Sequence, residues 1–258
     1  MIKNFLVCLL AGSAAGIGTG FAGLSASTVI APMLIAFMGY PWYESVGIGL
    51  ASDVLASAFS ALIYRKHDNV DLKNGVYMVV AVLIMTVAGS WFSQYMPDTE
   101  MSWISVAGAL FMGIRFIVRP VSEHHASFIR RSDKRKKVLA FLSGAVIGFY
   151  CGFMGVGGGL MMLFILTMIL GYELKTAVGT SVFVMTFTAL TGSISHFAFG
   201  EVQSYIPSLL LCIFFTTLAA LITSHFANNM DAVKTNRATG ITLIALGVCM
   251  IGQMILGL

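Results

Sequence analysis

The sequence predicts an all-α integral membrane protein built from two homologous halves. Three observations support this prediction. The 258-residue chain is 58% hydrophobic and 10% charged, whereas soluble domains carry about 25% charged residues. Its apolar runs reach the length of roughly 20 residues that a membrane-spanning helix needs. Residues 12–70 and 144–202 also repeat one another at a fixed offset of 132 residues.

The repeat aligns without a gap and contains eleven identical pairs. Five pairs lie in two Gly-rich stretches, and the dipeptide Gly-Tyr recurs at Gly39–Tyr40 and Gly171–Tyr172. Duplication explains this pattern, and the compositional bias of membrane segments is the alternative. We therefore expect an N-terminal repeat over residues 1–118, a basic cytoplasmic linker over 119–137 and a C-terminal repeat over 138–258.

Each half begins with a long apolar segment, at residues 5–38 and 138–170. Seven of the sixteen residues from Gly144 to Gly159 are glycine, and each glycine disfavours a helix by about 1 kcal/mol relative to alanine. We expect this stretch to break the helix, so that each long segment forms a Gly-broken helical hairpin. A single long kinked helix is the competing interpretation. Three spans should follow in each half, at about 45–64, 75–95, 102–118, 177–197, 205–226 and 237–257.

Loop charges predict how the halves are oriented. Residues 119–137 contain seven Lys/Arg and two acidic residues, and loops 65–73 and 227–237 are also basic. Loops 97–101 and 197–204 contain acidic residues and no Lys or Arg. Basic loops remain in the cytoplasm, so equivalent loops of the two halves fall on opposite sides. This predicts inverted repeats with both termini outside.

Broken helices often form the substrate site of inverted-repeat transporters, because free backbone N–H groups at a helix N-terminus hold an anion. In the first half, Ser25 and Ser27 correspond to Gly157 and Gly159 of the second. Hydroxyl donors there suit an oxyanion, although close helix packing is the alternative. Thr180 and Ser181 provide two further hydroxyls at the beginning of a neighbouring span. The candidate substrate-binding residues are Gly20, Gly23, Ser25, Ser27, Gly155, Gly157, Gly158, Gly159, Thr180 and Ser181.

Two further polar residues lie in predicted spans. Asp53 lies about eight residues into an apolar segment, and an acid inside the membrane is a functional candidate. It is a candidate for coupling to a proton or cation, and a shallow position in contact with water is the alternative. Its repeat partner is Met185. His196 lies near a span end, where we expect a polar anchor at the membrane interface, and a group that titrates near neutral pH is the alternative.

Several of these residues together resemble a known family. Gly152-Phe153-Met154-Gly155-Val156-Gly157-Gly158-Gly159, followed by Ala177-Val178-Gly179-Thr180-Ser181, is similar to the TauE/SafE family of sulfite exporter-like permeases. The resemblance extends over nearly the whole chain and implies a small permease for sulfur-containing anions such as sulfite or organosulfonates. The first half departs from the family pattern, because Ser25 and Ser27 replace the expected glycines.

The sequence thus predicts a secondary transporter of a small anion in the bacterial inner membrane, with the lipid bilayer and that anion as its partners. A passive anion channel and a non-transporting membrane subunit are the alternatives. An enzyme is not expected, since no nucleophile–base pair or metal-binding motif is apparent, and no cofactor, metal or nucleic acid is expected. The oligomeric state is open, and a homodimer is compatible with the sequence.

Overall fold

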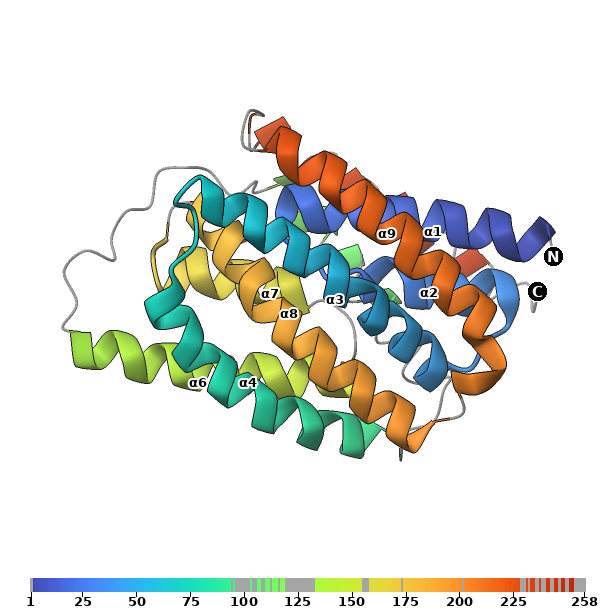
Figure 1. Cartoon of the computed structure of the whole chain (residues 1–258), viewed down its shortest axis with the longest axis horizontal. Coiled ribbons are helices and arrows are strands. Elements are labelled where there is room, and N and C mark those ends of the chain that lie inside the picture. Colours follow the sequence, from blue (N-terminus) through green and yellow to red (C-terminus); the bar gives the residue numbers. More distant parts are fainter. Residues whose placement is uncertain are drawn as a thin grey trace.

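The computed structural model describes residues 2–93, 95, 133–154, 158–172, 174–200 and 202–227, and parts of 103–118 and 231–252. Every regular element in these ranges is helical (Figure 1). The elements are α1 (Ile2–Ala22), α2 (Ser27–Met38), α3 (Trp42–Lys66), α4 (Leu72–Ser93), α6 (Asp133–Met154), α7 (Gly158–Phe164) with a π-helical continuation (Ile165–Ile169), α8 (Leu174–Phe199), and a 3₁₀ turn (Val202–Tyr205) leading into α9 (Ile206–Ala227).

The helix boundaries repeat at the offset seen in the sequence. α1 ends at Ala22 and α6 ends at Met154, while α3 and α8 begin 132 residues apart. Gly39 and Gly171 both adopt left-handed backbone conformations, with φ of 67° and 71°, which glycine adopts without steric cost. The next residue in each case donates its N–H to an equivalent carbonyl, Tyr40 to Leu34 and Tyr172 to Leu166.

Each Gly-rich stretch breaks its helix as expected, but only toward the C-terminal end of the stretch. α6 runs without interruption through Gly144, Gly148 and Gly152, and the expected break comes after them, since α6 ends at Met154 and α7 begins at Gly158. The helix ends only after Met154, and Gly155 and Gly157 lie outside the described residues. Spacing of four residues places these glycines on one helix face, where close packing outweighs their low helix propensity.

Glycines of α1 and α6 bring helices of the two halves into direct backbone contact. A Cβ atom at Gly16 of α1 would collide with the Thr216 carbonyl oxygen of α9, and one at Gly148 of α6 would lie 2.8 Å from the Val82 carbonyl of α4. Successive glycines along one helix contact successively later residues of the partner helix. The helices α1 and α9 therefore run parallel, as do α4 and α6. Each half thus contributes one helix to the packing of the other.

The first long segment forms a hairpin. Its second helix, α2, returns along α1 and ends beside the beginning of α1, where the Tyr40 hydroxyl lies 2.8 Å from Ser208 Oγ. Ser208 in turn donates to Asn4 Oδ1. A single kinked helix would instead place Tyr40 far from Asn4, and that alternative is wrong for this half.

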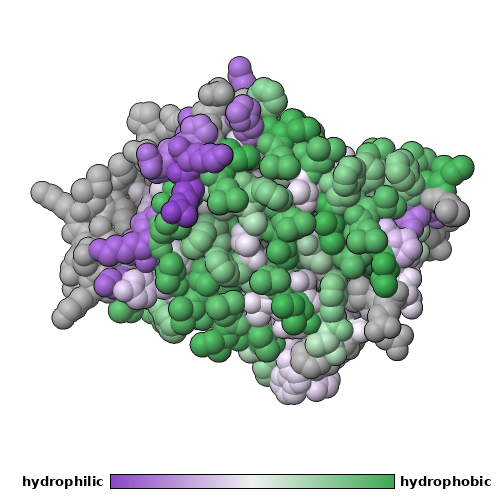
Figure 2. Space-filling view, viewed as in Figure 1, coloured by the Kyte–Doolittle hydropathy of each residue, from purple (hydrophilic) through white to green (hydrophobic). Residues whose placement is uncertain are grey.

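The surface of α9 is typical of a membrane helix. Apolar side chains are exposed at every fourth position, whereas small and polar residues such as Ser208, Thr216 and Ala220 are buried. Within the described residues, five helices are long and apolar enough to cross a bilayer: α1, α3, α4, α8 and α9. Hydrophobic residues cover most of the face shown in Figure 2, and hydrophilic residues gather toward one end. The exposed apolar stripe of α9 is Ile206, Leu210, Phe214, Leu218, Ile222 and Phe226.

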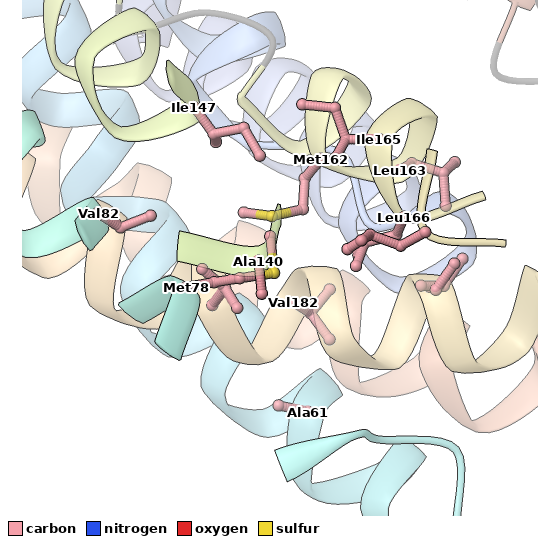
Figure 3. Packing of buried hydrophobic residues seen from close by; sticks show 14 of the residues in the cluster. Ala61, Met78, Val82, Ala140, Ile147, Met162, Leu163, Ile165, Leu166 and Val182 are labelled. Atoms are coloured by element: carbon pink, nitrogen blue, oxygen red, sulfur yellow. The ribbon is translucent and has the colours of Figure 1, made fainter. Parts of the chain in front are cut away.

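The repeat partners α3 and α8 pack against each other at the centre of the molecule. A buried apolar cluster lies against α8 and includes Met162 and Leu166 from the α7 segment (Figure 3). The same cluster contains Val82 of α4, Ile147 of α6 and Val182 of α8. It therefore fixes the position of the second helix break, where the candidate site lies.

Candidate functional site

The first break joins the end of α1 to the beginning of α2. Gly23 has a φ of +63°, and its N–H and that of Leu24 cap the last carbonyls of α1, those of Thr19 and Gly18. The chain then reverses, and α2 begins at Ser27 without a side-chain cap on its first turn. Ser25 Oγ and Ser27 Oγ lie 2.8 Å apart and bond to one another, so two hydroxyls stand together at this N-terminus.

The second break meets the first. Gly159, in the first turn of α7, is buried, and a Cβ atom there would collide with the Gly23 carbonyl oxygen and lie 2.7 Å from the Ser25 nitrogen. Ser181 of α8 donates its hydroxyl proton to the same Gly23 carbonyl, at 3.3 Å. The structure therefore brings together Gly23, Ser25, Ser27, Gly159 and Ser181; we call these five residues the junction.

The packing around the junction follows the repeat. Gly49 of α3 contacts the Cα of Ser27, where a Cβ would approach to 2.6 Å. The repeat partners of Gly49 and Ser27 are Ser181 and Gly159, and Gly159 lies against α8 at Met185. Small residues at these four positions allow both breaks to approach the central α3–α8 pair. Gly158 begins α7 next to Gly159.

Asp53 lies one turn further along α3 and is 1% exposed. Its carboxylate faces the Ser25 hydroxyl and the Ala26 backbone N–H, but neither carboxylate oxygen makes a well-formed hydrogen bond. This burial contradicts the alternative of a water-exposed Asp53. On the second half, Met185 occupies the equivalent position, with its sulfur 2.7 Å from a Cβ built on Gly159.

Two other predicted site residues face elsewhere. Gly20 packs against Thr223 and Ser224 of α9. The Thr180 hydroxyl accepts a hydrogen bond from the Asp71 backbone N–H at 3.0 Å, which ties the beginning of α8 to the loop before α4. Neither residue faces the junction, and both hold helices together.

Contrary to our expectation, His196 does not lie at an exposed interface position. It is fully buried and lies between two backbone carbonyls, those of Tyr43 and Gly152, each 3.2 Å from a ring nitrogen. The expectation of an interface anchor was therefore wrong. A neutral imidazole has a single N–H, so it satisfies only one of these carbonyls. The sequence offered no signal for this position, because the two carbonyls belong to distant segments.

Asp71 and Tyr172 form a contact between the halves at the end where α3 and α4 meet. The Tyr172 hydroxyl donates to Asp71 Oδ2, and Asn74 donates to both carboxylate oxygens. Burial alone would raise the pKa of the Asp71 carboxyl, but the hydrogen bonds from Tyr172 and Asn74 together outweigh it and hold the pKa below its usual range. The ionised carboxylate therefore stabilises this contact.

We expect Tyr172→Phe to lower the free energy of unfolding at pH 7 by about 1 kcal/mol, the usual contribution of one hydrogen bond. Because the Asp71 pKa is depressed in the folded protein, its contribution is present above the unfolded pKa of about 3.9 and is lost as the pH falls through the folded value. Thermal unfolding in detergent from pH 7 to pH 3 should show the difference between variant and wild type shrinking below about pH 4.

The matched control is Tyr40→Phe, at the equivalent position of the repeat. It removes a hydrogen bond to the uncharged Ser208 hydroxyl, so its cost should not change over the same pH range. A Tyr172→Phe cost that persists unchanged at pH 3 would contradict the role assigned to the Asp71 carboxylate.

Helices of bilayer length with apolar faces outward, enclosing a polar junction of two helix breaks, define a multi-pass membrane protein with the architecture of a transporter. The chain belongs to the TauE/SafE family: the family model described as "Sulfite exporter TauE/SafE" matches residues 8–250.

The curated relatives agree with this class. A probable membrane transporter protein of Methanocaldococcus jannaschii is 30% identical over 218 residues, covering 81% of this chain and 75% of the relative. Another from Bacillus subtilis is 25% identical over 220 residues, covering 78% and 81%. A third, from Haemophilus influenzae, is 24% identical over 94% of this chain and 93% of its own length. No solved structure matches the chain.

Proposed function

We propose that this protein is a secondary transporter that carries a small sulfur-containing anion, such as sulfite or an organosulfonate. The observation that carries the proposal is the junction, where hydroxyls, a helix N-terminus and glycine backbone meet inside the membrane-spanning bundle. Backbone N–H groups and hydroxyls can replace the hydration shell of an oxyanion. The description of the family supports sulfite-like substrates.

We propose that the two halves are inverted repeats that alternate access to the junction. Two observations support the inversion. The end of α3 lies against the end of α1, where the Tyr64 hydroxyl donates to the Gly20 carbonyl, so α1 and α3 share a direction. α4 returns after a short loop and runs parallel to α6. α6 therefore runs opposite to its repeat partner α1, as the traces in Figure 1 suggest.

We place the protein in the bacterial inner membrane, with the loop between α3 and α4 in the cytoplasm. The exposed Arg65 and Lys66 in this region support that side, because basic loops remain inside. A thiol-reactive, membrane-impermeant reagent tests this placement on Asp68→Cys in whole cells. Labelling only after the cells are opened supports it, and labelling of intact cells contradicts it.

Thermal unfolding of the purified protein with sulfite, sulfate, thiosulfate, methanesulfonate and acetate tests the substrate class. We expect a saturable rise in the unfolding midpoint with at least one sulfur oxyanion, because a ligand that binds the folded state stabilises it. Acetate serves as the control for general anion effects. No saturable shift with any sulfur anion would contradict the proposal and favour a non-transporting subunit.

Counterflow in proteoliposomes separates a transporter from a channel. Vesicles loaded with unlabelled methanesulfonate should transiently accumulate the labelled anion above its equilibrium level, because a carrier exchanges one molecule for another. A channel would equilibrate the label without any overshoot.

A further inference from the structure

The Asp53 carboxylate is a buried charge-bearing group beside the junction that the anion site itself does not explain. It is 1% exposed and neither oxygen has a hydrogen-bond partner. An isolated carboxylate buried in an apolar medium is costly unless it is neutralised. Such a group inside a membrane bundle is retained for a function rather than for stability.

The position of Asp53 links it to the anion. Its carboxylate faces the Ser25 hydroxyl and the N–H of Ala26, which precedes the first residue of α2. These are the same donors that an anion at the junction would use. Two negative charges so close together cannot both be accommodated, since a like charge disfavours ionisation of its neighbour.

A metal cation fits this place poorly. The groups that face the carboxylate are the hydroxyl and the backbone N–H of the first break, and an N–H cannot ligate a cation. No group of three His, Cys, Asp or Glu able to hold a metal occurs in the part of the chain that the structure describes.

Among the described residues, few other titratable groups lie near Asp53. The Cys151 thiol of α6 interacts electrostatically with the Asp53 carboxylate, and Cys151 packs with Leu50 of α3. From the first break, Ser25 and Ala26 are neutral. Within the described ranges, no basic side chain of α2, α8 or α9 acts on the carboxylate, so a proton is the available neutralising charge.

We propose that Asp53 carries the proton that accompanies the anion, so that the junction binds one anion and one proton together. This inference rests on the proposed function. A proton enters from water on the side to which the junction is open, bonds to a carboxylate oxygen of Asp53, and leaves to water on the other side together with the anion. The coupling is reciprocal: the proton raises the affinity for the anion, and the anion raises the affinity for the proton.

Proteoliposomes with an imposed pH gradient test this coupling, with labelled methanesulfonate as the probe because its sulfonate stays ionised. Wild type should concentrate the probe on the alkaline side by up to about tenfold per pH unit, as one-to-one linkage requires. Asp53→Asn should still exchange the probe at equal pH on both sides but concentrate it less than about twofold. The same accumulation by Asp53→Asn and wild type would overturn the proposal.

Two variants serve as controls. Asp71→Asn removes a carboxylate whose hydrogen-bond partners are Tyr172 and Asn74 rather than junction residues, and it should still concentrate the probe. Asp53→Met copies the residue found at the equivalent position of the second half, Met185, and should behave as Asp53→Asn does. Accumulation by Asp53→Met at the wild-type level would count against the proposal.

Infrared spectroscopy of the purified protein distinguishes failure of this inference from failure of the proposed function. A protonated carboxyl band that titrates between about pH 5 and pH 9 in wild type and is absent in Asp53→Asn supports a proton-carrying Asp53. A carboxylate that stays ionised throughout overturns it. Absence of methanesulfonate exchange by wild type at equal pH would instead contradict sulfonate transport, and the infrared result would then decide the role of Asp53.

Discussion

Replacing Gly159 by alanine is expected to abolish transport while leaving the protein in the membrane. The added methyl group would collide with the Gly23 carbonyl oxygen and crowd the Ser25 nitrogen, both of which belong to backbone that cannot rotate away. The two breaks would be forced apart, and donors that must converge on one anion would no longer do so. A displacement of about 1 Å is enough to reduce activity by about a hundredfold.

Methanesulfonate counterflow, normalised to the amount of protein in the vesicles, measures this effect. The matched control is Gly252→Ala, since a Cβ at Gly252 meets no atom of the described residues within 4 Å; it should retain wild-type exchange. Wild-type exchange by Gly159→Ala would show that the junction is not part of the transport pathway. Loss of the protein from the membrane would show instead that Gly159 acts in folding.

Replacing Gly16 by leucine is expected to destabilise the whole fold. Gly16 faces the Thr216 carbonyl oxygen and the Ala220 nitrogen of α9, and a large side chain there would separate α1 from α9 along their full contact. Overpacking of a tight interior costs about 1–3 kcal/mol, and a forced separation of two backbones should lie at or above the upper end. The midpoint of thermal unfolding in detergent, followed by size-exclusion chromatography, measures the loss.

The control for this prediction lies two residues away. Gly18→Ala adds a methyl group that meets the Leu24 side chain at 3.2 Å, a flexible neighbour that can move aside. It should change the midpoint little. Equal effects of Gly16→Leu and Gly18→Ala would mean that the contact between α1 and α9 does not determine stability.

Local sequence signals predicted much of the fold. Long apolar runs gave the approximate bounds of α3, α4, α8 and α9, whereas the predicted spans 102–118 and 237–257 lie largely outside the described residues. The 132-residue offset anticipated that α6 would end at the position equivalent to the end of α1. These features depend on local hydrophobicity and on the position of Gly39 and Gly171 after each hairpin, both of which are visible in the sequence.

Contacts between distant segments were not predictable from those signals. Gly144, Gly148 and Gly152 looked like helix breakers because glycine propensity is a local property, whereas their partner, the backbone of α4, lies far away in the chain. The same limit explains Thr180, whose partner is the Asp71 backbone, and His196, which lies between carbonyls of α3 and α6. The meeting of Gly159 with Gly23 follows from the repeat only once the direction of each helix is known.

The exchange of helices between the halves has a consequence for biosynthesis. The α1 residue Cys8 lies against Ser208, 200 residues later in the chain. During synthesis at about 5–20 residues per second, the glycine face of α1 therefore waits in the bilayer for roughly ten seconds or more before α9 arrives to cover it. The first half cannot reach its final packing on its own, and the ribosome must finish most of the second half before either half is complete.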